Sequence, residues 1–190
     1  MYLEPIFSTP IWSEKLNLNT SSIESYSYDL RKKDSGRIIS NHGGWQSSDL
    51  YNLDNTPLQN LINDTKKLLK ICFETLQVSK EPIIDNTWIN INPPGSFNKS
   101  HIHGNNSFLS AVYYVKAEKN CGNIYFDRGS KEEYILSNFI PEGMNVFNSS
   151  RWQYKAEENK LIIFPSWLSH SVGINNSNSD RISIALNIRL

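Results

Sequence analysis

The sequence has few cysteines and no long apolar run. Its two cysteines, Cys72 and Cys121, do not form a Cys-x-x-Cys pair, and a disulfide between them is not expected. No apolar stretch reaches the roughly 18 residues that a membrane-spanning helix needs. The opening residues also lack a charged segment before an apolar stretch, which is the pattern of a secretory signal. These absences predict a soluble cytoplasmic protein with reduced thiols and no membrane partner.

An excess of charge of either sign is also absent. The 19 basic and 19 acidic side chains give a formal net charge of zero, and neither kind is concentrated in one stretch. Phosphate contacts require a basic stripe, so nucleic acid is not an expected partner. Hydrophobic residues make up 38% of the chain and aromatic residues 12%, which is enough for a buried core in 190 residues. We therefore expect residues 1–190 to form a single domain.

The N-terminal part predicts a strand and then a short helix. Residues 1–16 contain two prolines and are typical of an edge strand with a turn. Residues 20–33 predict a helix, with Thr20, Ser21 or Ser22 as the capping residue.

A glycine-containing segment and a longer helix are expected next. Residues 35–52 are predicted to be a loop. The second helix should begin at Thr56 and Pro57, because proline suits the first helical position and threonine can cap. Its apolar residues recur every three or four positions up to about Leu76 to Ser79.

From position 82 onward the pattern changes to short runs of alternating or β-branched residues. Clusters of Gly, Asn, Ser and Pro separate these runs, which favours a β-sandwich or barrel. The expected strands are Thr87–Asn92, Leu109–Lys116, Asn123–Phe126, Met144–Phe147, Lys160–Pro165, Ser169–Gly173 and Arg181–Arg189. The chain is thus predicted to be mainly β with N-terminal helices: residues 1–80 support an all-β core formed by residues 82–190.

Three of the four histidines fall in the predicted β region. His101 and His103 form a His-x-His pair, and residues two apart on a strand point to the same face. His170 follows much later, on another predicted strand. Three imidazoles from two strands leave coordination positions open, which is the layout of a catalytic metal site. The pair alone is a weak signal, because a surface strand can carry two histidines by chance.

The surroundings of these histidines resemble the 2-oxoglutarate and Fe(II)-dependent oxygenases, in particular the prolyl-hydroxylase-like branch. The similar segments lie in order along the second half of the chain: residues 92–103, 109–115, 121–126 and 161–172, then Arg181. The chain is also similar to a family of uncharacterised phage and bacterial oxygenases in residues 7–12, in residues 41–47 and in the His-x-His motif. The resemblance implies a double-stranded β-helix core of the jelly-roll, cupin-like type.

The resemblance also implies a cofactor set and an activity. Iron(II) would be bound by the three histidines, and 2-oxoglutarate by Arg181, Ser183 and Tyr114, which stand at matching offsets. The expected activity is an oxygenase reaction, most simply a hydroxylation, that couples O2-dependent decarboxylation of 2-oxoglutarate to substrate oxidation. Ascorbate is a candidate accessory reductant. Taken alone, Arg181 is better explained by a surface ion pair at the start of the last strand, and Tyr114 would suit an ordinary core position.

One departure from the family pattern leaves the third iron ligand open. The usual triad is two histidines and a carboxylate, and here His103 stands at the carboxylate position. His103 can bind iron itself, or it can stay off the metal while water or chloride fills the position. A shifted register would instead make His103 the first ligand and Asn105 the stand-in for the carboxylate. Asp127 is placed away from iron, and the loop around His42 is interpreted as an anchoring loop or as a cover over the site.

Two other function classes fit the same histidines. One is a cupin-type three-histidine dioxygenase that works without a keto acid, and the other is a non-catalytic jelly-roll binding or structural module. The substrate is not readable from the sequence beyond a small molecule or a protein. The N-terminal strand and helix could support a homodimer, although no pattern demands one.

Overall fold

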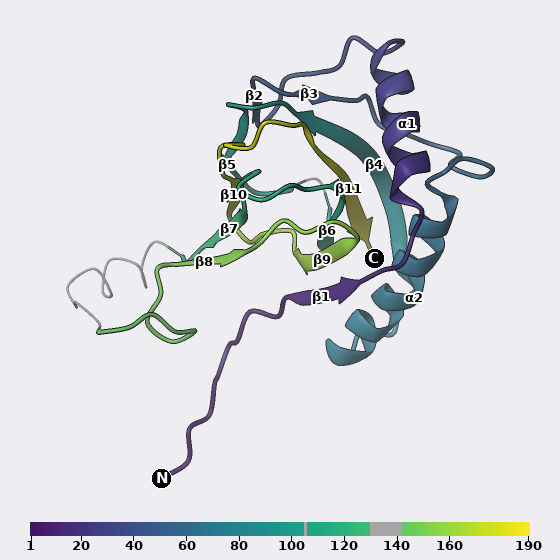
Figure 1. The fold of residues 1–190 in the computed structure, drawn as a ribbon. Helices are drawn as coiled ribbons and strands as arrows, with labels where there is room; N and C mark the ends of the chain where they lie inside the picture. Colours follow the sequence, from purple (N-terminus) through teal and green to yellow (C-terminus); the bar gives the residue numbers. More distant parts are fainter. Residues whose placement is uncertain (105, 130–141) are drawn as a thin grey trace.

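The computed structural model describes residues 1–104, 106–129 and 142–190, and within them two antiparallel sheets and two helices (Figure 1). The larger sheet has the order β1-β9-β6-β11-β4-β3. Its strands are β1 (Trp12–Lys15), β9 (Lys160–Pro165), β6 (Leu109–Lys116), β11 (Arg181–Arg189), β4 (Ile83–Asn92) and β3 (Trp45–Gln46). The mainly β architecture with N-terminal helices is confirmed.

The smaller sheet has five strands in the order β2-β5-β10-β7-β8. They are β2 (Asn41–His42), β5 (Phe97–His101), β10 (His170–Val172), β7 (Ile124–Asp127) and β8 (Arg151–Tyr154). Strands next to one another in the chain mostly lie in opposite sheets, so the two sheets form the two walls of a jelly roll. The segment that was predicted to be loop, residues 35–52, contains β2 and β3, which extend both walls at one end.

All but one of the predicted strands exist. β4 begins at Ile83 rather than Thr87, and β7 and β10 lie within one residue of their predicted bounds. β6, β9 and β11 have the predicted bounds, and β1 is the edge strand expected in the N-terminal segment. The strand predicted at Met144–Phe147 is wrong. This segment is a turn in which Asn145 Oδ1 accepts from the backbone N–H of Phe147 at 2.8 Å. Strand β8 was not predicted.

Both predicted helices exist: α1 begins at the predicted residue 20 but has a different capping residue, and α2 begins later than predicted. Helix α1 (Thr20–Arg31) is capped by Asn19, whose Oδ1 accepts from the backbone N–H of Ser22, and not by the three residues proposed from sequence. Helix α2 (Gln59–Thr75) begins after a turn closed by Thr56, whose hydroxyl donates to the carbonyl of Leu53 at 2.6 Å. The capping threonine therefore stabilises the turn before the helix rather than the first helical turn.

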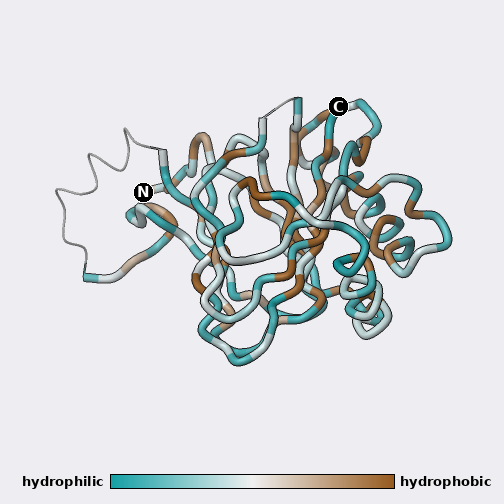
Figure 2. Tube along the Cα trace, turned by 90° about the horizontal axis from the view of Figure 1, so that it is seen from above, coloured by the Kyte–Doolittle hydropathy of each residue, from teal (hydrophilic) through white to brown (hydrophobic). Residues whose placement is uncertain are grey.

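The two helices cover one face of the larger sheet (Figure 1). Alternate residues of each strand point to this face. In β11 these are Ile182, Ile184, Leu186 and Ile188, and all four are buried in the cluster that includes the helices. Figure 2 shows the hydrophobic segments concentrated inside the molecule and the hydrophilic ones on peripheral loops. The main hydrophobic core thus lies between helices and sheet, outside the jelly roll itself.

A second, smaller cluster lies between the two sheets. It contains Tyr114, Ile124, Phe126, Ile162 and Phe164. These residues fill only part of the space between the walls, and the remainder includes a cavity lined by residues of both sheets. The division leaves the interior of the jelly roll available for polar side chains.

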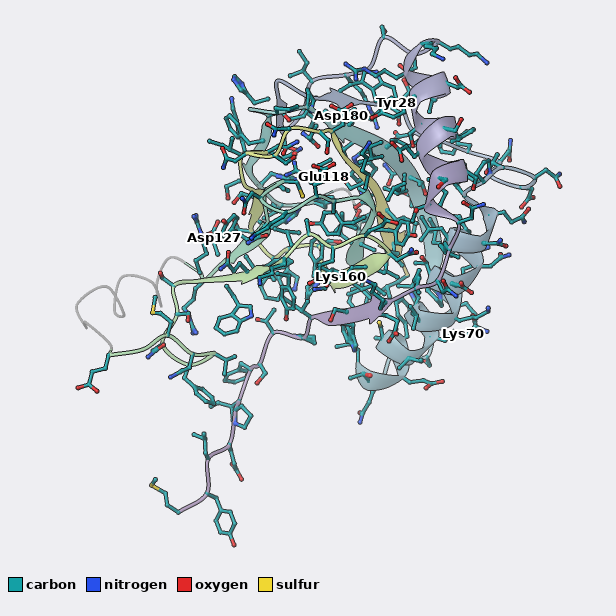
Figure 3. All side chains as sticks on the ribbon, in the orientation of Figure 1. Tyr28, Lys70, Glu118, Asp127, Lys160 and Asp180 are labelled. Atoms are coloured by element: carbon teal, nitrogen blue, oxygen red, sulfur yellow. The ribbon has the colours of Figure 1, made fainter. Side chains whose placement is uncertain are left out.

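Helix α1 also fixes the beginning of β11. The hydroxyl of Tyr28 donates to Asp180 at 2.9 Å, next to the first residue of the strand, and Figure 3 labels both residues. Lys116, at the end of the neighbouring β6, pairs with Glu24 of the helix at 2.8 Å. The helix therefore stabilises the strand ends that lead into the cavity.

The sequence predicted neither a disulfide nor a membrane-spanning helix. Cys72 and Cys121 are both buried and unpaired, so the expected absence of a disulfide between them is confirmed. Neither α1 nor α2, the helices of the described residues, is long and apolar enough to cross a membrane.

Candidate metal centre

The three predicted histidines come together between the sheets. Their ring centroids are 4.3 Å apart for His101 and His170, 5.0 Å for His103 and His170, and 5.2 Å for His101 and His103. One ring nitrogen from each lies within 4.8 Å of the others. Three imidazole nitrogens at this separation can bind one metal ion from one side and leave the other side open.

Two strands and one loop position these rings. His101 is the last residue of β5 and is the register partner of His170, the first residue of β10. The sequence predicted that His103 lies on the same strand as His101. In the structure it lies two residues beyond the end of β5. Its backbone N–H donates to the carbonyl of Ser166 at 2.9 Å, and this contact holds the departing chain against the opposite wall.

Each histidine has an oxygen atom against its Nδ1. His101 Nδ1 lies 2.7 Å from the carbonyl of Lys99, and His170 Nδ1 lies 2.9 Å from the carbonyl of Leu168. His103 Nδ1 contacts Oδ1 of Asn187. An oxygen acceptor favours the tautomer with hydrogen on Nδ1, so the lone pair for a metal is on Nε2 in all three rings.

Burial keeps these rings neutral. It lowers the pKa of His170 to about 3, and the neighbouring His101 contributes to the same shift. Burial also lowers the pKa of His101 and of His103 below the ordinary histidine value. Neutral imidazole is the form that binds metals, so the site is ready for an ion near neutral pH without releasing protons from its ligands.

The histidines line a cavity of about 350 Å³ that extends toward Arg181. The side chain of Arg181 is only 1% exposed, so the alternative of a surface ion pair is wrong. Its Nη1 donates to the carbonyls of Cys121 and Gly173, at 2.5 and 3.2 Å. Its Nη2 has no hydrogen-bond partner among the described residues, and a buried donor in this state calls for an acceptor.

Tyr114 and Ser183 lie beside this guanidinium. They are register partners on β6 and β11, and both line the same cavity. The buried hydroxyl of Tyr114 has no partner among the described residues, and burial raises its pKa, so the phenol stays a donor. The guanidinium and the phenol thus offer two buried donors without protein acceptors, which fits an anionic ligand such as a carboxylate.

Gly122 makes room for the arginine. A Cβ atom at this position would lie 2.6 Å from Nη1 of Arg181 and 2.2 Å from the carbonyl oxygen of Gly173. Its φ of +92° is also a conformation that other residues avoid. The structure therefore explains why glycine stands at position 122. A side chain there would prevent the loop carbonyls from approaching the Arg181 guanidinium.

The remaining candidates lie elsewhere. His42 is exposed and packs on Phe97 at a centroid distance of 4.7 Å, so it is not part of the histidine cluster. Trp45 is buried and donates to the carbonyl of Asp34 at 2.9 Å, which agrees with an anchoring loop, whereas Gln46 lines the cavity. Asn105, which would replace the carboxylate ligand if the register were shifted, lies outside the described residues.

Asp127 lies away from the metal centre, as predicted. It is labelled in Figure 3 at the end of β7, where its carboxylate accepts from Arg151 Nε at 2.6 Å and from Ser100 at 3.2 Å. It does not belong to the histidine cluster.

Two cavity residues were missed in the sequence. Asn187 contacts His103, and Asn90 has a buried Oδ1 without a hydrogen-bond partner in the described part of the chain. The signal that could have found Asn187 is the alternation of β11. Positions 181, 183, 185 and 187 share one face, and all four line the cavity.

Comparison with known proteins agrees with this geometry. The family model described as "Putative 2OG-Fe(II) oxygenase" matches residues 86–187, more than half of the chain. The chain belongs to this family. The match includes the three histidines, Arg181, Ser183 and Tyr114. No curated protein sequence matches the chain.

Solved structures of this oxygenase class share the fold. A prolyl-4-hydroxylase from Pseudomonas putida is 13% identical with a TM-score of 0.65, and the alignment covers 96% of this chain and 93% of that one. A prolyl hydroxylase from Trichoplax adhaerens, solved with a peptide fragment, is 12% identical with a TM-score of 0.66 and coverages of 94% and 83%. HygX from Streptomyces hygroscopicus, with nickel and 2-oxoglutarate bound, is 12% identical with a TM-score of 0.62 and coverages of 95% and 83%. The jelly-roll prediction is confirmed.

Proposed function

We propose that this oxygenase binds iron(II) through His101, His103 and His170, and 2-oxoglutarate through Arg181, Ser183 and Tyr114. One observation carries the proposal: a single cavity contains three converging imidazoles and, on its wall, two buried donors that lack acceptors among the described residues. Imidazole suits iron(II), and the two donors suit the distal carboxylate of a keto acid.

Each residue has a defined task in this proposal. The neutral histidines hold the metal from one side and leave open positions for ligands. Nη1 of Arg181 is already engaged with loop carbonyls, so the contact with the carboxylate falls on Nη2. The phenol of Tyr114 donates a second hydrogen bond, and Ser183 adds a hydroxyl from the adjacent position.

Held by these residues, the metal would activate O2, which is the oxidant, and decarboxylation of the keto acid would supply two of the electrons that reduce it, coupled to oxidation of the substrate. A site with three neutral ligands has one more positive charge than a site with two histidines and a carboxylate. This charge strengthens the binding of an anionic co-substrate.

The substrate remains a prediction at the level of a small molecule or a protein. The Trichoplax enzyme was solved with a peptide fragment, and HygX with hygromycin B, so the fold admits both kinds. Four further points stay predictions: the absence of a nucleic-acid partner, a possible homodimer, a cytoplasmic location and ascorbate as a candidate accessory reductant.

The test is anaerobic titration of the purified protein with Fe(II) and 2-oxoglutarate, followed by succinate formation in air. A visible charge-transfer band and 2-oxoglutarate-dependent succinate are expected. Tyr114→Phe removes only the phenol hydroxyl and should raise the half-saturating 2-oxoglutarate concentration roughly tenfold, the worth of a hydrogen bond to a charged group.

Arg181→Ala separates the two enzyme classes. It should abolish succinate formation if the keto acid is the co-substrate. Oxygen uptake that persists in Arg181→Ala, together with no band in the unaltered protein at saturating ligand, would instead assign a three-histidine dioxygenase that needs no keto acid. Circular dichroism of the variant checks that the overall β fold is intact.

A further inference from the structure

The three histidines differ in what holds their outer nitrogen. His101 and His170 each face the backbone carbonyl two residues earlier in their own segment. The orientation of these rings is therefore set by local backbone, which side-chain substitutions leave in place. His103 faces a side chain instead, the amide of Asn187, from a strand of the opposite sheet 84 residues away.

The amide is oriented by two buried serines. The hydroxyl of Ser110 donates to Oδ1 of Asn187 at 3.0 Å, and the hydroxyls of Ser110 and Ser166 are 2.8 Å apart. Both serines are fully buried. The same oxygen atom, Oδ1 of Asn187, accepts from Ser110 and contacts Nδ1 of His103.

The consequence reaches the metal side of the ring. An oxygen against Nδ1 of His103 places the hydrogen on Nδ1, and the lone pair then faces the cavity from Nε2. Ser166 contributes a second time, because its carbonyl accepts from the backbone N–H of His103 at 2.9 Å. Ser166, Ser110 and Asn187 thus fix both the backbone position and the tautomer of one histidine.

We propose that Asn187 is the positioning residue for His103 as a metal ligand, with Ser110 fixing the orientation of its amide. The inference rests on the proposed function. It adds that a substitution at Asn187 should weaken metal binding by His103 although His103 itself is unchanged. The residue that stands at the family's carboxylate position depends on a side chain, whereas the other two histidines do not. Losing an outer hydrogen-bond partner of a metal ligand typically weakens metal binding about 10- to 100-fold.

The experiment measures Mn(II) affinity by anaerobic calorimetry and Co(II) binding by its visible spectrum, both without turnover. Asn187→Leu keeps a similar volume and removes the acceptor, so Mn(II) binding should weaken about 10- to 100-fold and the Co(II) spectrum should change. Asn187→Asp keeps an oxygen at the same place and should restore affinity to within a few-fold of the unaltered protein. Ser110→Ala, which is the smaller change, should give a smaller loss.

A matched control and a double variant make the result specific. Asn86 is the register partner of Asn187 on β4 and lines the same cavity, but its amide nitrogen donates to Asp49 at 3.1 Å. Asn86→Leu should therefore leave Mn(II) affinity unchanged. In a His103→Ala background, Asn187→Leu should have no further effect, because its action passes through the histidine.

The outcomes separate this inference from the proposed function. If the unaltered protein does not bind Mn(II) or Co(II), the metal site itself is wrong. If His103→Ala weakens binding but Asn187→Leu and Ser110→Ala do not, the metal site stands and the positioning role is overturned. The role is also overturned if His103→Ala has no effect, or if Asn187→Leu still weakens binding when His103 is absent.

Discussion

The two faces of strand β11 have different tasks. The face formed by positions 182, 184, 186 and 188 is wholly aliphatic and is buried against the helices. The face formed by positions 181, 183, 185 and 187 lines the cavity and contains an arginine, a serine and an asparagine. Because side chains alternate along a strand, one nine-residue segment serves both the hydrophobic core and the candidate site.

This comparison explains how a polar interior can be tolerated. Burial of Arg181 and partial burial of Asn187 are costly unless their polar atoms are paired. The hydrophobic contacts that offset such costs lie on the other face of the same sheet, between strands and helices. A clean division would mean that substitutions on the helix face change stability alone, and substitutions on the cavity face change ligand binding.

The largest effect is expected on the cavity side. His170→Ala removes one of three converging nitrogens, and metal affinity should fall by more than the 10- to 100-fold that the loss of an outer partner typically costs. Calorimetry with Mn(II) measures the change, and circular dichroism should show an intact fold. If this variant binds Mn(II) as tightly as the unaltered protein, the metal does not bind at the histidine cluster, and the cavity has no metal-binding task.

The matching substitution on the helix face is Ile184→Ala. Ile184 is fully buried, and truncation of such a side chain usually lowers the free energy of unfolding by about 2–5 kcal/mol. Urea denaturation of the metal-free protein measures this loss, while Mn(II) affinity of the folded variant should stay the same. A large loss of metal affinity together with a small loss of stability would show that the two faces are coupled.

The sequence was most informative where a single physical rule decides the outcome. β6, β9 and β11 have the predicted bounds. β6 and β9 are runs of mostly aliphatic and aromatic residues, and β11 alternates aliphatic residues with others after a segment rich in turn residues. The histidine cluster was also foreseen from spacing and resemblance. Met144–Phe147 misled the prediction because four mostly apolar residues suit either a strand or an exposed turn; Met144 is 64% exposed in the structure.

The part of the site that could not be predicted depends on distance along the chain. The contact between Asn187 and His103 joins residues 84 positions apart across two sheets, and no local pattern encodes it. The same is true of Arg181, whose Nη1 is held by carbonyls of distant loops. Sequence resemblance indicated the arginine, but only the packing of the two walls shows which of its nitrogens is left without a partner among the described residues.

The pH dependence of the free energy of unfolding should come from the cavity side and not from the helix face. The pKa of His170 is lowered to about 3 in the folded protein, whereas in the unfolded chain it is near 6.5. Between these values the unfolded state binds more protons, so the free energy of unfolding falls as the pH falls. From pH 7 to pH 5 the metal-free protein should lose about 2 kcal/mol through this residue.

Urea denaturation of chelator-treated protein at the two pH values measures this loss. Ile184→Ala should lower stability at both pH values and leave the pH dependence unchanged. His170→Ala should flatten the dependence. An equal slope in all three proteins would mean that His170 is protonated in the folded state and that burial does not keep it neutral.

The smallest effect is expected at Asp127, on the outer side of the smaller sheet. Ser100 and Ser169 alternate with His101 and His170 along their segments, and their hydroxyls contact each other at 3.0 Å on the face opposite the metal centre. Asp127 accepts from Ser100 on that same face, so its carboxylate points away from the histidines. Asp127→Asn should therefore leave Mn(II) affinity unchanged.

The cost of Asp127→Asn in stability should be at most about 1 kcal/mol, because its ion pair with Arg151 is partly exposed to solvent. Calorimetry and urea denaturation of this single variant measure both quantities. A tenfold loss of Mn(II) affinity would indicate that Asp127 is a metal ligand and supplies the carboxylate of the usual triad. A three-histidine centre would then be wrong. An unchanged affinity instead leaves His103, held by an amide, as the group at the carboxylate position.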